Sequence, residues 1–233
     1  MSSTGRQPLV LLGGMLGDAT AWDGVVPGVH DRAAVRVCQI DRDDTVSAMA
    51  AGVLAVASPQ FALAGHSLGG IVALETYRQA PHRVTRLGLV NSSARGPSQG
   101  QLAAWSSWRA RVEAGEFAAV AAELASATLP AGRRAELTRR NLAMARTVGA
   151  EGFLRQLAAQ ATRPDSRPRL NRIAVPTLVI TGELDQTCPA ALQAELAAAI
   201  PSAEHHTIQG AGHMCPIEAP TVLAGHLRSW LAR

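Results

Sequence analysis

The segment Gly65–Gly70 carries a serine in a setting that could make its hydroxyl a nucleophile. It follows a short apolar run and precedes a stretch rich in Ala and Leu, the context that a Gly-x-Ser-x-Gly turn between a strand and a helix requires. Glycines two residues before and after Ser67 leave room for the strained backbone of such a turn. A chance Gly/Ser turn is the alternative, and the flanking runs argue against it. We therefore predict that Ser67 is exposed on a sharp turn and attacks an electrophilic carbon.

A serine hydroxyl needs a base to take its proton. His213 is the preferred candidate because it lies in a glycine-rich loop, directly after the strand-like run His205–Gln209. The other histidines fall in predicted loops, helices or strands, or inside the serine turn, and have no comparable setting: His30, His66, His82, His205, His206 and His226. We predict that His213 is the base and that His66 packs inside the serine turn.

The base in turn needs a carboxylate that orients it. Asp185 follows the apolar run Thr177–Ile180 by a short turn, whereas the rival Glu183 is expected to be a solvent-exposed turn residue. The carboxyl ends of parallel strands meet at one edge of a sheet, where open α/β sheets bind their ligands. We therefore expect Ser67, Asp185 and His213 to meet at that edge.

A glycine-rich turn, Gly13–Gly17, follows the first apolar run. It is predicted to bring the Met15 N–H close to a substrate oxygen, with the Leu68 N–H as the second donor. Loss of one such donor costs about 10²–10³ in rate, so two are expected. A dinucleotide-binding loop is the alternative; Asp41 suits it, but the glycine spacing does not match Gly-x-Gly-x-x-Gly.

Alternation of apolar runs with helix-like stretches favours an α/β fold, with a mostly parallel sheet and helices on both faces. The predicted strands are Pro8–Leu12, Ala34–Ile40, Phe61–Ala64, Leu87–Val90, Thr177–Ile180 and His205–Gln209. The predicted helices are Thr45–Ala57, Leu68–Ala80, Ala190–Ile200 and Thr221–Leu231.

Residues 95–168 interrupt this alternation, because they contain no strand-like run and show Ala, Leu, Arg and Glu at helical spacing. We expect three or four helices here, inserted as a cap into a core made of residues 1–94 and 169–233. Predicted helix stops are Gly115, Pro130–Gly132, Gly149 and Gly152. The proline-containing segment Arg163–Pro168 is predicted to be a linker back to the core.

The composition excludes several function classes. The chain has 233 residues, a formal charge of +4 and no Lys, and its arginines form no basic stripe, so no nucleic-acid partner is expected. No apolar run is long enough to cross a membrane, so no membrane partner is expected either. Cys38, Cys188 and Cys215 fit neither a disulfide framework nor a zinc site. Leu9–Leu16 imitates a signal peptide but coincides with a predicted core strand, and we expect a cytoplasmic location.

Four motifs in this order resemble the α/β-hydrolase superfamily, in the branch that carries a helical lid. They are the glycine-rich turn after the first strand, the serine turn, the Gly182–Asp185 turn and the loop around His213. The chain order Ser67, Asp185, His213 is the order of that superfamily. Gly13-Gly14 stands where the family often has His-Gly, so a side-chain role for that histidine is absent. Similar members include small carboxylesterases, enol-lactone hydrolases, acyl-carrier-protein methyl ester esterases and carbon–carbon bond hydrolases.

The resemblance implies a serine hydrolase that cleaves a carboxylic ester or lactone of a small, mainly apolar molecule through an acyl-enzyme on Ser67. No metal or organic cofactor is expected. Alternatives are a carbon–carbon bond hydrolase or another acyl-transfer, lyase or perhydrolysis enzyme with the same triad, and a non-catalytic binding module. The oligomeric state is not predicted.

The pocket is expected between sheet and cap, because ligand sites are mostly apolar and aromatic. Predicted lining residues are Trp22, Trp105, Trp108, Phe117, Met144 and Phe153. Arg109 or Arg140 of the cap could hold a substrate carboxylate.

Overall fold

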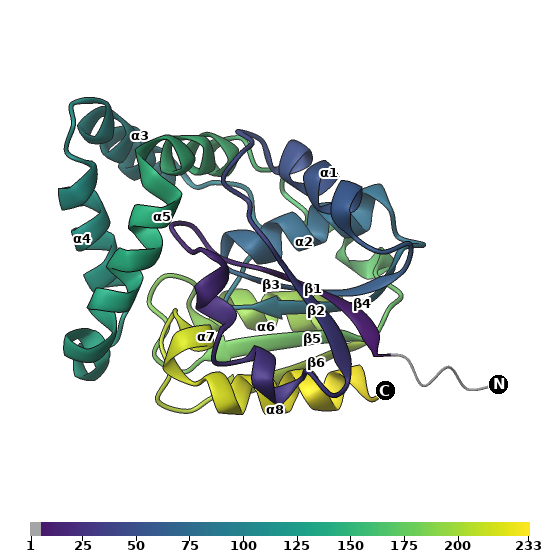
Figure 1. Ribbon diagram of the computed structural model, residues 1–233. Coiled ribbons are helices and arrows are strands. Elements are labelled where there is room, and N and C mark those ends of the chain that lie inside the picture. The colour runs from purple at the N-terminus through teal and green to yellow at the C-terminus, as the bar shows by residue number, and fades with distance from the viewer. Residues whose placement is uncertain (1–5) are drawn as a thin grey trace.

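Six strands form one sheet in the computed structural model, which describes residues 6–233 (Figure 1). Their bounds are β1 Gln7–Leu12, β2 Ala33–Cys38, β3 Phe61–His66, β4 Val84–Val90, β5 Thr177–Gly182 and β6 Ala203–Ile208. The order across the sheet is β2-β1-β3-β4-β5-β6, and every neighbouring pair is parallel. The predicted fold class, an α/β fold with a parallel sheet flanked by helices, is confirmed.

The strands differ in burial as their positions in the sheet require. β3 and β5 are buried at every residue, whereas the edge strands β2 and β6 are partly exposed and carry Arg36, Glu204, His205 and His206. Parallel strands covered by helices on both faces lose contact with water on both faces, which explains their continuous apolar runs.

Helices cover both faces of this sheet, and alternate strand residues enter two hydrophobic clusters. Leu9 and Leu11 of β1 enter one cluster, and Val10 and Leu12 enter the other. The second cluster includes residues of α1 Val46–Val56, α2 Leu68–Gln79 and α6 Ala190–Ala199. The first includes residues of α7 Cys215–Glu218, α8 Pro220–Leu231 and the 3-10 helix Ala19–Trp22. A second short 3-10 helix, Val26–Gly28, follows the 3-10 helix Ala19–Trp22 along the chain.

Only helices lie between β4 and β5 in the described chain. They are α3 Gln99–Glu113, α4 Phe117–Ala127, α5 Arg134–Ala161 and the 3-10 helices Ala131–Arg133 and Arg167–Arg172. Figure 1 shows α3, α4 and α5 gathered at one end of the sheet, and we call them the cap helices. A capping box begins α3, since the Ser98 hydroxyl accepts from the Gln101 N–H and the Gln101 side chain accepts from the Ser98 N–H.

Gly149, one of the predicted helix stops, breaks the helical backbone within α5. Gly149 has φ 71° and ψ 174°, so two helical segments meet at a kink there, whereas the second segment continues past Gly152. A Cβ at Gly152 would lie 3.2 Å from the Cβ of Asp41, so this part of α5 packs closely on the core. The predicted break at Gly149 is thus confirmed. The predicted stop at Gly152 is wrong, because this residue lies inside the second helical segment, where its small size allows close packing on Asp41.

A third hydrophobic cluster joins the cap helices to the core. It contains Trp105 of α3, Val120 of α4 and Phe153 of α5, together with Leu16 from the turn after β1. Within residues 6–233, no helix combines the length and the hydropathy that a membrane span requires.

Candidate active site

Ser67 occupies the turn between β3 and α2. Its backbone has φ 53° and ψ −116°, and such a conformation costs a non-glycine residue about 1–3 kcal/mol. A Cβ at Gly65 would lie 2.1 Å from the carbonyl oxygen of Gly69, and a Cβ at Gly69 would lie 2.6 Å from that of Gly13. Close backbone contact therefore requires both glycines of the motif.

His213 lies between Ser67 and Asp185. The Ser67 hydroxyl donates to His213 Nε2 at 3.0 Å, and His213 Nδ1–H donates to Asp185 Oδ2 at 2.9 Å. Asp185 and His213 are only 4% and 5% exposed. The rival carboxylate, Glu183, is exposed and accepts from the Gly210 N–H instead. The structure thus brings together three side chains that follow three different strands.

The second carboxylate oxygen of Asp185 is also held. Its Oδ1 accepts from the backbone N–H of Thr187 at 2.8 Å and of Cys188 at 2.9 Å. A carboxylate oxygen can accept two hydrogen bonds, and these two donors prevent rotation of the group. Asp185 can therefore both orient the imidazole and balance its positive charge.

Two further side chains, Asn91 and Glu218, fix the loop that carries His213. Asn91 follows β4; its Nδ2 donates to the carbonyl oxygens of Gly212 and His213, and its Oδ1 accepts from Gly182 N–H. The buried Glu218 carboxylate accepts from the N–H groups of Gly212 and Met214. Sequence reasoning assigned neither residue to the site; the available signal for Asn91 was its position directly after a predicted strand.

His66 also contacts this loop. Its Nε2–H donates to the carbonyl oxygen of His213 at 2.7 Å, and the centroids of the two imidazole rings lie 5.0 Å apart. Burial lowers the pKa of His66 to about 3, so its imidazole is neutral at physiological pH. His66 therefore packs inside the serine turn as expected, and it also helps to hold His213.

Two backbone N–H groups near Ser67 are unpaired. Met15 and Leu68 have no hydrogen-bond partner for this group among residues 6–233. The turn that carries Met15 approaches the serine closely, since a Cβ at Gly14 would lie 3.1 Å from the Ser67 Cβ. The same turn is tied to the cap by a bond from the Leu16 N–H to Gln156 Oε1 at 2.9 Å. Both free donors are thus available to an oxygen bound beside Ser67.

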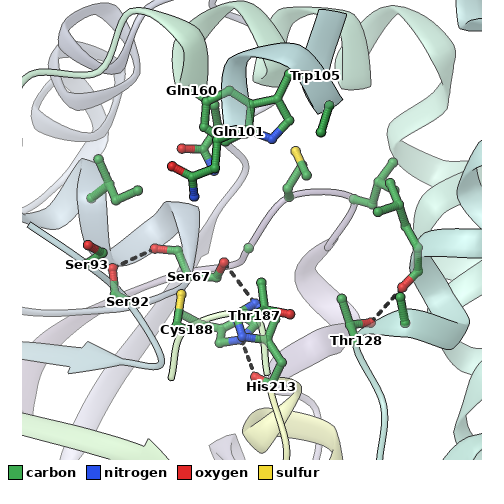
Figure 2. Close-up of a pocket in the computed structure, with 18 of the residues that line it drawn as sticks. Ser67, Ser92, Ser93, Gln101, Trp105, Thr128, Gln160, Thr187, Cys188 and His213 are labelled. Carbon is green, nitrogen blue, oxygen red and sulfur yellow. Dashed lines mark hydrogen bonds between the residues drawn. The ribbon is translucent and has the colours of Figure 1, made fainter. Parts of the chain in front are cut away.

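Ser67 and His213 open into a cavity of about 710 Å³ between the core and the cap helices. This volume lies in the range of small-molecule sites, about 300–1,000 Å³. In Figure 2, Trp105, Gln101 and Gln160 lie on the cap side of the cavity, across from Ser67 and His213.

The predicted lining residues divide into two groups. Trp105, Trp108 and Met144 line the cavity. Trp22 does not: its side chain is fully buried in the hydrophobic cluster that includes α8. Phe117 and Phe153 pack against each other inside the cap, with ring centroids 6.1 Å apart. The sequence identifies these residues as apolar and aromatic but does not show which side of an inserted helix faces the cavity.

The two arginines suggested for a substrate carboxylate also lie elsewhere. Arg109 donates to the carbonyl oxygen of Leu154 and pairs with Glu113. Arg140 donates to the carbonyl oxygen of Thr20. Neither lines the cavity, whereas Arg95 and Arg163 do. Arg163 is in the segment predicted to be a linker, so its place in the wall was missed.

One group of potential metal ligands lies close together within the described chain, namely Asp185, Cys188 and His213. Asp185 and His213 already bond to each other. Burial raises the pKa of the Cys188 thiol to about 12, and a thiol needs deprotonation to bind a metal tightly. These residues fit a hydrogen-bonded pair with a neighbouring thiol better than a metal centre.

Comparison with known proteins is consistent with this geometry. A family model described as the alpha/beta hydrolase family matches residues 9–226. A relative from Escherichia coli O81 named "Putative carbamate hydrolase RutD" is 27% identical, over 96% of this chain and 91% of the relative. The structure of a thermophilic esterase from Thermogutta terrifontis, with malate bound, has a TM-score of 0.87 and 25% identity, covering 99% of this chain and 91% of that one. An enol-lactonase from Burkholderia xenovorans LB400 shares the fold, with a TM-score of 0.86 and 20% identity over 98% and 92% of the two chains.

Proposed function

The chain belongs to the alpha/beta hydrolase family and is a hydrolase, and from that premise we propose that it cleaves carboxylic esters or lactones through an acyl-enzyme on Ser67. The observation that carries the proposal is the unbroken series of hydrogen bonds from Asp185 through His213 to Ser67, which ends at the cavity. A protein that only bound a ligand would have no need of this arrangement.

In the first half-reaction, Ser67 Oγ attacks the carbonyl carbon while His213 Nε2 takes the hydroxyl proton. The carbonyl oxygen becomes an oxyanion, to which the Met15 and Leu68 N–H groups donate. The bond to the leaving alcohol then breaks, and His213 returns the proton to the alcohol oxygen. For a lactone, that hydroxyl stays attached to the acyl group.

In the second half-reaction, water attacks the acyl carbon and gives its proton to His213 Nε2. The bond to Ser67 Oγ breaks, His213 protonates Ser67, and the free acid leaves. Asp185 holds Nδ1–H throughout, so that Nε2 is unprotonated when a proton must be taken. The Asn91, Glu218 and His66 contacts keep His213 at this position.

The cavity supports a small substrate with an apolar part. Trp105, Trp108 and Met144 supply apolar surface, and the volume of about 710 Å³ suits a molecule well below the size of a lipid or polymer. The similarity to the RutD proteins over 96% of this chain adds carbamates as a second substrate class. Carbamate cleavage uses the same attack at a carbonyl carbon.

A substrate panel tests the proposal. Small aryl and alkyl esters, lactones, carbamates and a vinylogous diketone are offered to the wild type, to Ser67→Ala and to Ser93→Ala. Ser93 is the matched control because it lines the same cavity, and its hydroxyl accepts from the Arg95 N–H rather than pairing with His213. We expect turnover of esters or lactones, with a loss in kcat on the order of 10⁴–10⁶ for Ser67→Ala and little change for Ser93→Ala. Turnover of the diketone alone, or full activity in Ser67→Ala, contradicts it.

A further inference from the structure

Arg163 is a buried charge with no acidic partner. It is 7% exposed and follows the end of α5. No Asp or Glu oxygen lies within 4 Å of its guanidinium among residues 6–233. The other arginine of the cavity wall, Arg95, is neutralised by Glu195 at 2.8 Å. Arg163 therefore leaves one uncompensated positive charge beside the cavity.

Neutral oxygens satisfy the hydrogen bonds of this guanidinium. Its Nε donates to the carbonyl oxygen of Arg95 at 2.9 Å, its Nη1 to Gln160 Oε1 at 2.6 Å and its Nη2 to Gln101 Oε1 at 3.1 Å. Its carbon lies 5.2 Å from the centroid of the Trp105 ring. These contacts fix the geometry of the group but do not cancel its charge, and a buried charge is costly until an opposite charge reaches it.

The same contacts determine which way two amide groups face. A guanidinium is donor-only, so the oxygens of Gln101 and Gln160 must point toward it and their NH₂ groups must point away. Neither Nε2 has a hydrogen-bond partner within the part of the chain that the structure describes. Both side chains line the cavity on the side opposite Ser67 (Figure 2). By orienting these two amides, Arg163 leaves the NH₂ groups of Gln101 and Gln160 unpaired at the cavity.

We propose that this wall binds a carboxylate of the substrate, through the NH₂ groups of Gln101 and Gln160 and in the field of Arg163. A planar group with two acceptor oxygens and a negative charge matches two neighbouring donors and an unpaired cation. The inference rests on the proposed function and narrows it: the ester or lactone carries a free carboxylate at the end remote from the scissile bond. The apolar part of the substrate then lies between this wall and Ser67, beside Trp105.

The test compares two esters that differ only in charge. Monomethyl adipate ends in a carboxylate, and methyl 6-amino-6-oxohexanoate has a neutral amide of the same shape. We expect the wild type to favour the carboxylate ester by about 10- to 100-fold in kcat/KM, the range of a charge-assisted hydrogen bond. Equal kcat/KM for the two esters overturns the inference.

Gln160→Glu is the decisive variant, because it keeps the shape of the side chain and places a carboxylate against Arg163. It neutralises the charge, removes one donor and repels the substrate carboxylate. We expect the ratio of the two kcat/KM values, carboxylate ester over amide ester, to fall to about 1 or below. Arg109→Gln is the matched control, since Arg109 is a cap arginine outside the cavity, and it should keep the preference. A preference that survives in Gln160→Glu overturns the inference.

Binding to the Ser67→Ala variant separates this inference from the proposed function. Isothermal titration with the two esters needs no catalysis, so tighter binding of monomethyl adipate supports the carboxylate site even when neither ester is hydrolysed. Conversely, if both esters are hydrolysed and bind with equal affinity, the serine hydrolase proposal stands and the carboxylate site is refuted. Arg163→Gln should also lose the preference for the carboxylate ester. If Arg163→Gln does not fold, Gln160→Glu decides the question.

Discussion

Replacing Asp185 by Asn tests how the carboxylate controls His213. Oδ1 of Asp185 accepts two backbone N–H groups, from Thr187 and Cys188. In the variant, the amide oxygen must take this position, because the NH₂ group cannot accept. The NH₂ then faces His213 Nδ1 across the present distance of 2.9 Å. Two donors cannot bond, so the imidazole must move its proton from Nδ1 to Nε2.

This change of tautomer sets the size of the effect. With Nε2 protonated, His213 can no longer take the proton of Ser67. We expect kcat to fall by about 10⁴-fold, equivalent to about 5.4 kcal/mol in the activation barrier. If Asp185 supplied only a hydrogen bond, its loss would cost about 1 kcal/mol, which is less than 10-fold in rate. The two explanations therefore differ by about three orders of magnitude.

The assay is the steady-state hydrolysis of a small aryl ester by the wild type, Asp185→Asn and Glu183→Gln. Glu183 is the matched control, because it is a neighbouring carboxylate that contacts the Gly210 N–H rather than His213. Glu183→Gln should stay within about 3-fold of the wild type, and unfolding curves should show that both variants are folded. A kcat for Asp185→Asn within 10-fold of the wild type would refute the tautomer argument.

Three further predictions concern stability and the cavity. Gly69→Ala should lower the free energy of unfolding, measured by urea titration, by about 1–3 kcal/mol, because the new Cβ would lie 2.6 Å from backbone atoms. Gly225→Ala in α8 should raise or preserve the free energy of unfolding, because the new Cβ meets open space. The pKa of His66 is lowered from 6.5 to about 3 in the folded state, so below pH 6.5 the unfolded state binds more protons than the folded state. The free energy of unfolding should therefore fall on acidification by up to about 1.4 kcal/mol per pH unit. His66→Gln should flatten this slope, and an unchanged slope would contradict the assignment. Trp105→Ala should raise KM, because this ring lines the cavity, whereas Trp22→Ala should lower unfolding free energy by about 3–5 kcal/mol without raising KM; a rise in KM for Trp22→Ala alone would contradict their placement.

The sheet and the three side chains at its edge could be predicted because their signals are local. A strained turn requires glycines at fixed spacing, and Gly65 and Gly69 reveal it without knowledge of the fold. A buried parallel strand has an apolar run, and the residue after that run lies at the carboxyl end of the sheet. Asp185 and His213 were found in this way, and the structure brings them to Ser67.

The cavity wall could not be predicted to the same extent, because it depends on how inserted helices pack. Trp22 and Trp105 look alike in the sequence, yet one is enclosed in the core and the other lines the cavity. Arg163 looked like part of a linker because prolines follow it, but tertiary contacts with Gln101 and Gln160 bury it. Periodicity shows that a segment is helical or lies in a turn. Only the packed structure shows which surface each side chain of that segment contacts.

The most direct test of the central claim is to identify the residue that reacts with a fluorophosphonate. The folded protein is treated with the probe, its intact mass is recorded, and the modified peptide is sequenced by mass spectrometry. The account predicts a single adduct on Ser67 that is lost in His213→Ala and retained in Ser93→Ala. An adduct on another residue, or a folded protein that takes up no probe, would contradict Ser67 as the activated nucleophile.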